Sequence, residues 1–177
     1  MDSKGKCINF YSATPGSNNV AVNDDEIEVK PAPLPEPRPL AGEERELLEF
    51  LLSGPVDSPE LRAQAEMAMV WAVCSCGCAS INLRVADDAP RATLTGPEVL
   101  PNGAAEISAT GMNEDGEEMD VTLHVWSPNE GYYVRKGGAV LAEIEVWPTL
   151  AIGDSTYGYK KPPAISALRF STHKWMI

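Results

Sequence analysis

Histidine is scarce in this chain, and the common catalytic signatures are missing from it. His124 and His173 are the only two histidines, so a Ser-His-Asp or Cys-His arrangement would have to use one of them. The sequence contains no G-x-S-x-G, no P-loop and no G-x-G-x-x-G. His124 lies within an alternating strand pattern, where a packing or surface role is expected, and His173 lies in a basic tail. These features favour a non-enzymatic protein.

Long apolar runs are also missing. No stretch approaches the ~18–20 apolar residues that span a bilayer, and residues 1–7 lack the apolar segment of a secretory signal. Three of the four cysteines, Cys74, Cys76 and Cys78, are crowded together rather than spread as a disulfide framework. We therefore expect a cytoplasmic protein that does not interact with membranes.

Basic residues are in deficit. Lys and Arg number 14 against 26 Asp and Glu, which gives a formal net charge of −12. Such a field repels nucleic-acid phosphates and anionic lipids, whereas it attracts a basic protein surface. Solubility alone would also account for the acidity. The charge argues against direct nucleic-acid binding, and a protein with a basic surface is the expected partner.

Residues 1–39 differ in composition from the rest of the chain. A small, polar and then acidic stretch leads into residues 31–39, where five prolines occupy alternate positions. Proline removes backbone donors and favours extended polyproline II, so this pattern predicts a semi-rigid arm that adds little to the core. With 44% hydrophobic residues the chain can form a core. Its length of 177 residues fits one domain, which we expect at residues 40–177.

Two helices are predicted at the start of this domain. Between residues 42 and 53, leucines recur at helical spacing opposite a series of glutamates, and Gly54-Pro55 ends the pattern. Ser58 is suited to be the N-cap of a second helix over residues 59–65, with Pro59 at its first position. The two helices are expected to form a hairpin against a sheet.

Period-two patterns follow the helices. They predict strands near residues 67–76, 81–85, 106–112, 119–126 and 140–146, with a further one near 165–170. Asp115-Gly116 is a strong hairpin signal between two of them. A run of helices followed by a run of strands indicates an α+β fold with an antiparallel sheet of five or six strands.

The C-terminal part is turn-rich and basic. Beyond Asp154 there is no acidic residue, whereas Lys160, Lys161, Arg169 and Lys174 supply positive charge. Two interpretations are open: the tail folds back on the acidic body, or it serves as an attachment segment.

Part of the chain resembles a group of uncharacterised small acidic proteins of high-GC actinobacteria and their phages. The resemblance rests on the acidic Leu-rich segment 43–52, on 60–64, on the C-x-C-G-C-x-S-[IV] turn at 74–81, and on E-x-E-V at 143–146. It covers about half the chain, and Ala79 stands where the group has Pro. The resemblance supports the architecture and implies no activity.

The cysteine cluster leaves three interpretations open. Cys74, Cys76 and Cys78 are favoured as structural thiols, with Cys74 and Cys76 reduced and largely buried, because Cys packs as a small hydrophobe. A turn at Gly77 could instead bring the thiols together as a zinc or redox site. A closed zinc site would need a fourth ligand, and Cys7, His124 and His173 lack zinc-knuckle spacing.

Two groups of carboxylates also have alternative roles. Glu143 and Glu145 share one face of a strand, which suits paired carboxylates, but a solvent-facing strand edge is the favoured interpretation. Residues 114–120 carry five carboxylates around a hairpin. Because EF-hand spacing is absent, we interpret this segment as a solvated turn rather than a calcium loop.

The sequence as a whole favours a protein-binding module without a cofactor, either an inhibitor or immunity-type protein or a component of an assembly. The predicted contact residues are acidic or aromatic: Glu117, Glu118, Asp120, Tyr132 and Tyr133. A homo-oligomer is compatible with the sequence. The alternative is a small metal- or thiol-dependent enzyme or sensor at Cys74, Cys76 and Cys78, with zinc as its cofactor.

Overall fold

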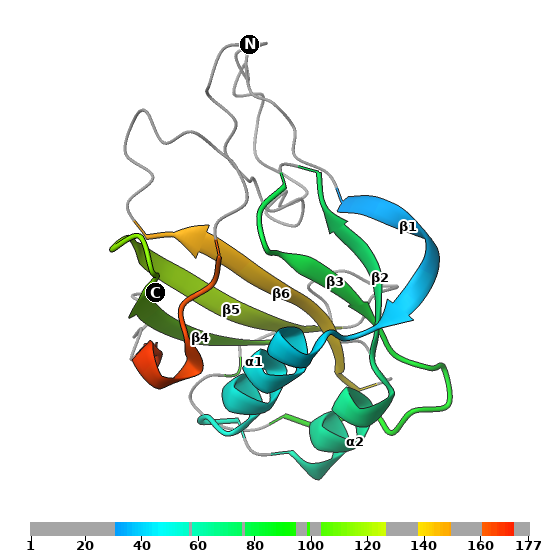
Figure 1. Cartoon of the computed structure of the whole chain (residues 1–177). Helices are drawn as coiled ribbons and strands as arrows, with labels where there is room; N and C mark the ends of the chain where they lie inside the picture. Colours follow the sequence, from blue (N-terminus) through cyan, green and yellow to red (C-terminus); the bar gives the residue numbers. More distant parts are fainter. Residues whose placement is uncertain are drawn as a thin grey trace, which may run out of the picture.

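A seven-stranded antiparallel sheet with two helices on one face forms the fold (Figure 1). The computed structural model describes residues 31–56, 58–75, 77–94, 99, 104–126, 138–149 and 161–171. The elements in chain order are β1 (Pro31–Pro39), α1 (Gly42–Leu52), α2 (Pro59–Met67), β2 (Met69–Cys74), β3 (Ile81–Arg84), β4 (Ala105–Met112), β5 (Glu118–Trp126), β6 (Val140–Pro148), the 3-10 helix η1 (Ile165–Ala167) and β7 (Arg169–Phe170). The sheet order is β1-β2-β3-β6-β5-β4-β7. The predicted α+β class is therefore confirmed.

The predicted number of strands was too low, because the sheet has seven strands rather than five or six. The proline-rich segment 31–39 is extended, as expected, but it pairs with β2 as an edge strand. An edge is the place in a sheet where missing N–H donors are tolerated. At the opposite edge, only Arg169 and Phe170 pair with β4, so the expected strand near 165–170 is mostly replaced by η1.

Helix α1 is held by an apolar stripe and by its first turn. Leu47, Leu48, Leu51 and Leu52 are buried against the sheet. Glu44 accepts a hydrogen bond from the Ala41 N–H at 2.7 Å and binds Arg38 with both oxygens at 2.7 Å. The bond from the Ala41 N–H to Glu44 is one half of a capping box. The other half is missing because the Ala41 side chain cannot accept a hydrogen bond. The Arg38 guanidinium also lowers the pKa of Glu44.

Helix α2 begins as the sequence predicts. Ser58 Oγ accepts the Leu61 N–H at 3.3 Å, and Pro59 occupies the first turn. Within the helix, the side-chain amide of the fully buried Gln64 forms hydrogen bonds with the backbone of two other segments. It donates to the carbonyls of Pro90 and Ala139 at 2.6 and 3.1 Å and accepts the Leu141 N–H at 2.9 Å. These bonds fix α2 to the start of β6.

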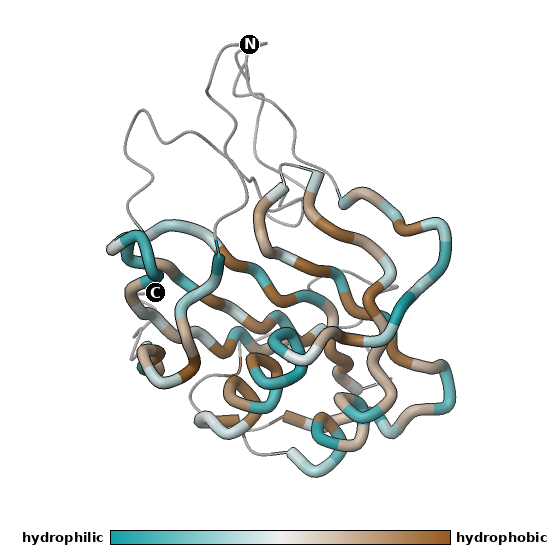
Figure 2. The backbone as a smooth tube through the Cα atoms, viewed as in Figure 1, coloured by the Kyte–Doolittle hydropathy of each residue, from teal (hydrophilic) through white to brown (hydrophobic). Residues whose placement is uncertain are grey.

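The core lies between the helices and the sheet. Alternate residues of the central strands, including Ile107, Leu123 and Ile144, point into it and are almost fully buried. Figure 2 shows this alternation as hydrophobic and hydrophilic residues along the strands. The β4–β5 hairpin turns at Gly116, whose φ of 77° is readily adopted by glycine. No helix of the described part of the chain is long and apolar enough to span a bilayer.

The described part of the C-terminal segment packs onto the body. Phe170 stacks on Phe50 of α1 with ring centroids 4.7 Å apart. Lys161 Nζ lies 3.0 Å from Glu114 Oε1. This part of the basic tail therefore folds back on the acidic domain, as one of the two interpretations predicts.

Candidate functional site

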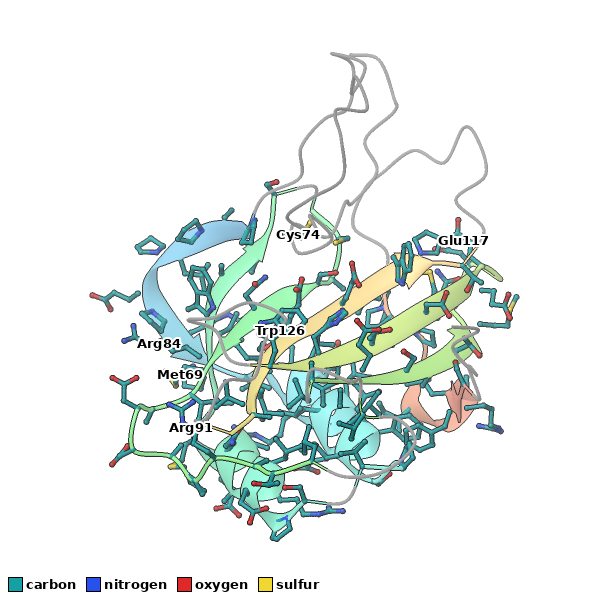
Figure 3. The ribbon with its side chains drawn as sticks, turned by 180° about the vertical axis from the view of Figure 1, so that it is seen from behind. Met69, Cys74, Arg84, Arg91, Glu117 and Trp126 are labelled. Carbon is teal, nitrogen blue, oxygen red and sulfur yellow. The ribbon has the colours of Figure 1, made fainter. Side chains whose placement is uncertain are left out.

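The face of β4, β5 and β6 that points away from the helices carries a series of polar and ionisable side chains. Strand registers align them in three rows: Glu106, His124 and Glu143; Ser108, Thr122 and Glu145; and Thr110, Asp120 and Trp147. We call these nine residues the polar sheet face. Figure 3 views the molecule from this side, with Trp126 near its centre and Glu117 at the far end of the β4–β5 hairpin.

His124 lies at the buried end of the polar sheet face. Its Nε2 is 3.1 Å from Glu145 Oε2, and its Nδ1 is 3.5 Å from Glu106 Oε1. The residue is 2% exposed, and Nδ1 has no hydrogen-bond partner among the described residues. The longer contact is therefore an ion pair rather than an aligned hydrogen bond. Trp126 packs beside the imidazole, with ring centroids 4.9 Å apart.

The carboxylates determine the charge of this cluster. Burial by itself lowers the pKa of His124, but the interactions with Glu106 and Glu145 outweigh it and raise the pKa to about 9. The ring is then an imidazolium cation at neutral pH. Burial raises the pKa of Glu143 to about 7, against the opposing attraction of His124. A charged histidine is thus held between carboxylates in the middle of the sheet.

This arrangement corrects the expectation for Glu143 and Glu145. They do not lie on a solvent-facing edge, because β6 is an interior strand between β3 and β5. Glu145 is only 7% exposed and Glu143 is half-buried. A sequence signal did exist, since polar residues alternate in parallel along 120–124 and 143–145. A buried imidazole does not meet a substrate from solvent, so the cluster favours a structural role.

The opposite end of the polar sheet face is open. Trp147 is 41% exposed and Met112 is 52% exposed. Asp120 lies opposite Trp147 in the register, and Glu118 lies opposite Met112. The strand alternation therefore places an indole, a thioether and two carboxylates together, and we call these four residues the Trp147 patch. Trp147 and Met112 were not selected from the sequence, although Trp147 continues the alternation of Glu143 and Glu145.

The other predicted contact residues have different positions. Glu117 belongs to the hairpin turn, where its carboxylate accepts a hydrogen bond from Asn113 Nδ2 at 3.2 Å and its N–H donates to Asn113 Oδ1 at 2.9 Å. Tyr132 and Tyr133 lie outside the described residues. The structure thus brings Glu118 and Asp120 to one face and assigns Glu117 to the turn.

The cysteine segment forms the predicted reversal. Gly77 has a φ of 81° and its N–H donates to the Cys74 carbonyl at 3.1 Å. Cys74 and Cys78 are half-buried, which is less than the largely buried thiol expected at Cys74, and Cys76 lies outside the described residues. Cys78 Sγ lies 3.2 Å from Ser80 Oγ. The described residues contain no group of three His, Cys, Asp or Glu side chains that could hold a metal ion, and the zinc alternative stays a prediction.

Comparison with known proteins identifies no relative. No protein-family model, no curated protein and no solved structure matches the chain. The resemblance to the actinobacterial and phage group therefore stays a prediction.

Proposed function

We propose that the chain is a protein-binding module that contacts a basic partner through the Trp147 patch. The observation that carries the proposal is the exposed indole of Trp147 beside the carboxylates of Asp120 and Glu118. Tryptophan is enriched among the residues that dominate binding energy at interfaces, because it buries a large apolar area at low conformational cost. A role as an inhibitor or as an assembly component belongs to the same proposal.

The side chains of the Trp147 patch indicate which kind of partner surface would bind it. An apolar socket is needed to receive the indole, and Lys or Arg side chains around it would complement Asp120 and Glu118. The net charge of −12 adds a long-range attraction that speeds encounter more than it deepens affinity. Exposed charges are screened over ~8 Å at physiological ionic strength, so association should slow as salt is added.

Site-specific crosslinking identifies the partner and tests the surface at once. A benzophenone amino acid at position 147 should capture a specific protein in an extract of the source cells. The same group at position 67 is the control, since Met67 is 43% exposed and lies on α2, away from the patch. Equal capture at both positions would contradict the proposal.

Kinetics with the purified partner then separates charge from packing. Glu118→Gln with Asp120→Asn should reduce the association rate about 3–10-fold at low salt, and Trp147→Ala should raise the dissociation rate roughly 10-fold or more. Asp87→Asn with Asp88→Asn is the matched control, because it removes the same charge at exposed positions away from the patch. An association rate that ignores both salt and the Glu118/Asp120 change would show that the acidity serves solubility only.

A further inference from the structure

A groove follows α1 on the helix-covered face of the sheet, opposite the Trp147 patch. It consists of two adjoining cavities of about 360 Å³ each, whose linings share Glu43, Leu47 and Pro162. Each cavity falls in the size range of ligand-binding sites. We call this continuous depression the α1 groove.

The floor of the α1 groove is apolar. Val73, Ile81, Ile144 and Val146 line one cavity from strands β2, β3 and β6, together with Ala79. Ile165 and Ala164 line the other. Ile81, Ile144 and Val146 are almost fully buried beneath this floor, whereas Val73 and Ala79 are partly exposed, so apolar groups of a ligand would be stabilised against these two side chains.

The rim of the α1 groove is acidic. Glu43 and Glu46 of α1 and Glu114 of the β4–β5 hairpin line it. Arg38 and Glu44 also lie at the rim, but they neutralise one another through two contacts of 2.7 Å. Within the described residues no ion pair is formed by Glu43 or Glu46. Two carboxylates are therefore available to a cation.

The chain itself contains an example of such a contact. Lys161 lines the groove and places its ammonium 3.0 Å from Glu114 Oε1, while Pro162 and Pro163 continue along the wall. A proline-containing segment thus supplies a cation to one rim carboxylate. Glu43 and Glu46 line the same cavity, and their carboxylates could accept a cation in the way that Glu114 does.

We propose that the α1 groove binds a short extended segment of a partner protein in which basic and apolar side chains alternate. The apolar side chains occupy the floor over Ile81 and Ile144, and the basic ones reach Glu43 and Glu46. Alternation is required because successive side chains of an extended peptide point to opposite sides. The groove and the Trp147 patch lie on opposite faces of the sheet, so this proposal is independent of the proposed function.

Peptide binding to the full chain tests the proposal. The probe is a fluorescein-labelled octapeptide of alternating Lys and Leu, measured by polarisation, with Lys/Ser and Glu/Leu octapeptides as controls. The Lys/Leu peptide should bind, and Glu43→Gln with Glu46→Gln should weaken its binding about 5–10-fold. Asp87→Asn with Asp88→Asn, at exposed positions outside both the groove and the Trp147 patch, is the charge-matched control and should have less than about a twofold effect.

Filling the groove provides the second arm. Ala79→Phe should weaken binding roughly 10-fold or more because the ring occupies the floor. Ala164→Trp should also weaken binding, because it fills the end of the groove near Lys161. Ala164 is exposed, so this change disturbs no core packing. Ala86→Phe, at an exposed position outside the groove lining, is the matched control. Methyl NMR should show peptide-induced shifts at Ile81, Ile144 and Val146 but not at Leu61 of α2.

Three results would overturn the proposal. Lys/Ser binding as tight as Lys/Leu binding would show that only charge is recognised. Equal weakening by the Glu43/Glu46 and Asp87/Asp88 changes would show that the attraction is not localised. Absence of binding by the Lys/Leu peptide up to about 1 mM would show that the groove does not accept this class of ligand.

Discussion

The charge of a single residue, His124, connects the stability of the fold to alkaline pH. Its pKa in the folded chain is raised to about 9 from the ordinary 6.5. The stabilisation is therefore fully present below pH 6.5 and is lost as the pH rises through 9. We expect the free energy of unfolding to fall by up to about 3 kcal/mol over this range. Urea titrations between pH 6 and pH 10 measure this change.

Two histidine variants test the assignment to His124. His173→Gln should keep the pH profile of the wild type, and His124→Asn should flatten it. A wild-type profile in His124→Asn would contradict the assignment.

At neutral pH the ionised carboxylate of Glu143 destabilises the fold, whereas the charged imidazole of His124 stabilises it. Burial raises its pKa to about 7 from 4.5, so ionisation costs the folded state free energy as the pH rises from 4.5 through 7. Glu143→Gln removes this cost. The variant should be about 1–2 kcal/mol more stable than the wild type at pH 8, a value reduced for the partial exposure of the side chain. At pH 4 the two should be equally stable. A variant less stable than the wild type at pH 8 would show that the carboxylate of Glu143 is needed by His124.

Features that depend on residues close together in the sequence were predicted correctly. Ser58 as N-cap, Gly116 in the hairpin and Gly77 in the reversal each follow from residues a few positions apart. The environment of His124 depends on which strands become neighbours. Glu106 and Glu145 are 18 and 21 residues from His124 in sequence, and only the order of the strands brings them together. Their burial therefore could not be derived from alternation alone.

Among the elements, β1 was the most difficult to predict. Proline alternation predicted an arm, and nothing within residues 31–39 indicates that β2 accepts them as a neighbour. The half-buried Leu34 packs against the core, and the Arg38–Glu44 pair joins the strand to α1. Helices α1 and α2, by contrast, were predicted to within about two residues because leucine spacing and end signals are properties of the helix itself.

Truncation distinguishes the strand from the segment that precedes it. Removal of residues 1–30 leaves every described contact of β1 in place, so we expect little change in Tm. Removal of residues 1–39 also exposes the edge of β2 and breaks the Arg38–Glu44 pair. It should lower the free energy of unfolding by roughly 3 kcal/mol and the Tm by roughly 6–12 °C. Calorimetry of the two truncated chains measures the difference, and equal melting of both would show that β1 pairing is dispensable.

Helix α2 depends on Gln64 for its attachment. Gln64→Ala would leave the carbonyls of Pro90 and Ala139 and the N–H of Leu141 without this partner. Unsatisfied buried groups cost about 1–3 kcal/mol each, and we expect a total loss of about 3–4 kcal/mol because some relaxation follows. Chemical denaturation measures the loss. Glu66→Gln, at an exposed position on the same helix, should change stability by less than about 0.5 kcal/mol. A similarly small effect of Gln64→Ala would mean that α2 docks through apolar packing alone.

At the scale of the whole molecule, the sheet separates two kinds of surface. One face holds the helices, the apolar core and the α1 groove, whereas the other holds the polar sheet face with its buried histidine and its open Trp147 patch. The α+β class followed from the order of the predicted elements. The two candidate surfaces did not, because each combines residues from several strands or from α1 and distant loops.

The prolines of β1 have a consequence for the behaviour of the protein at high concentration. An uncovered sheet edge is a template on which another chain can add a strand, and repeated addition leads to fibrils. In β1 the alternate prolines supply no N–H groups, and the register with β2 shifts between Pro33 and Arg38. A foreign strand would find neither a regular row of donors nor a straight edge there. We therefore expect this edge to be a poor template for an added strand, so the same prolines that obscured the strand in the sequence should disfavour aggregation.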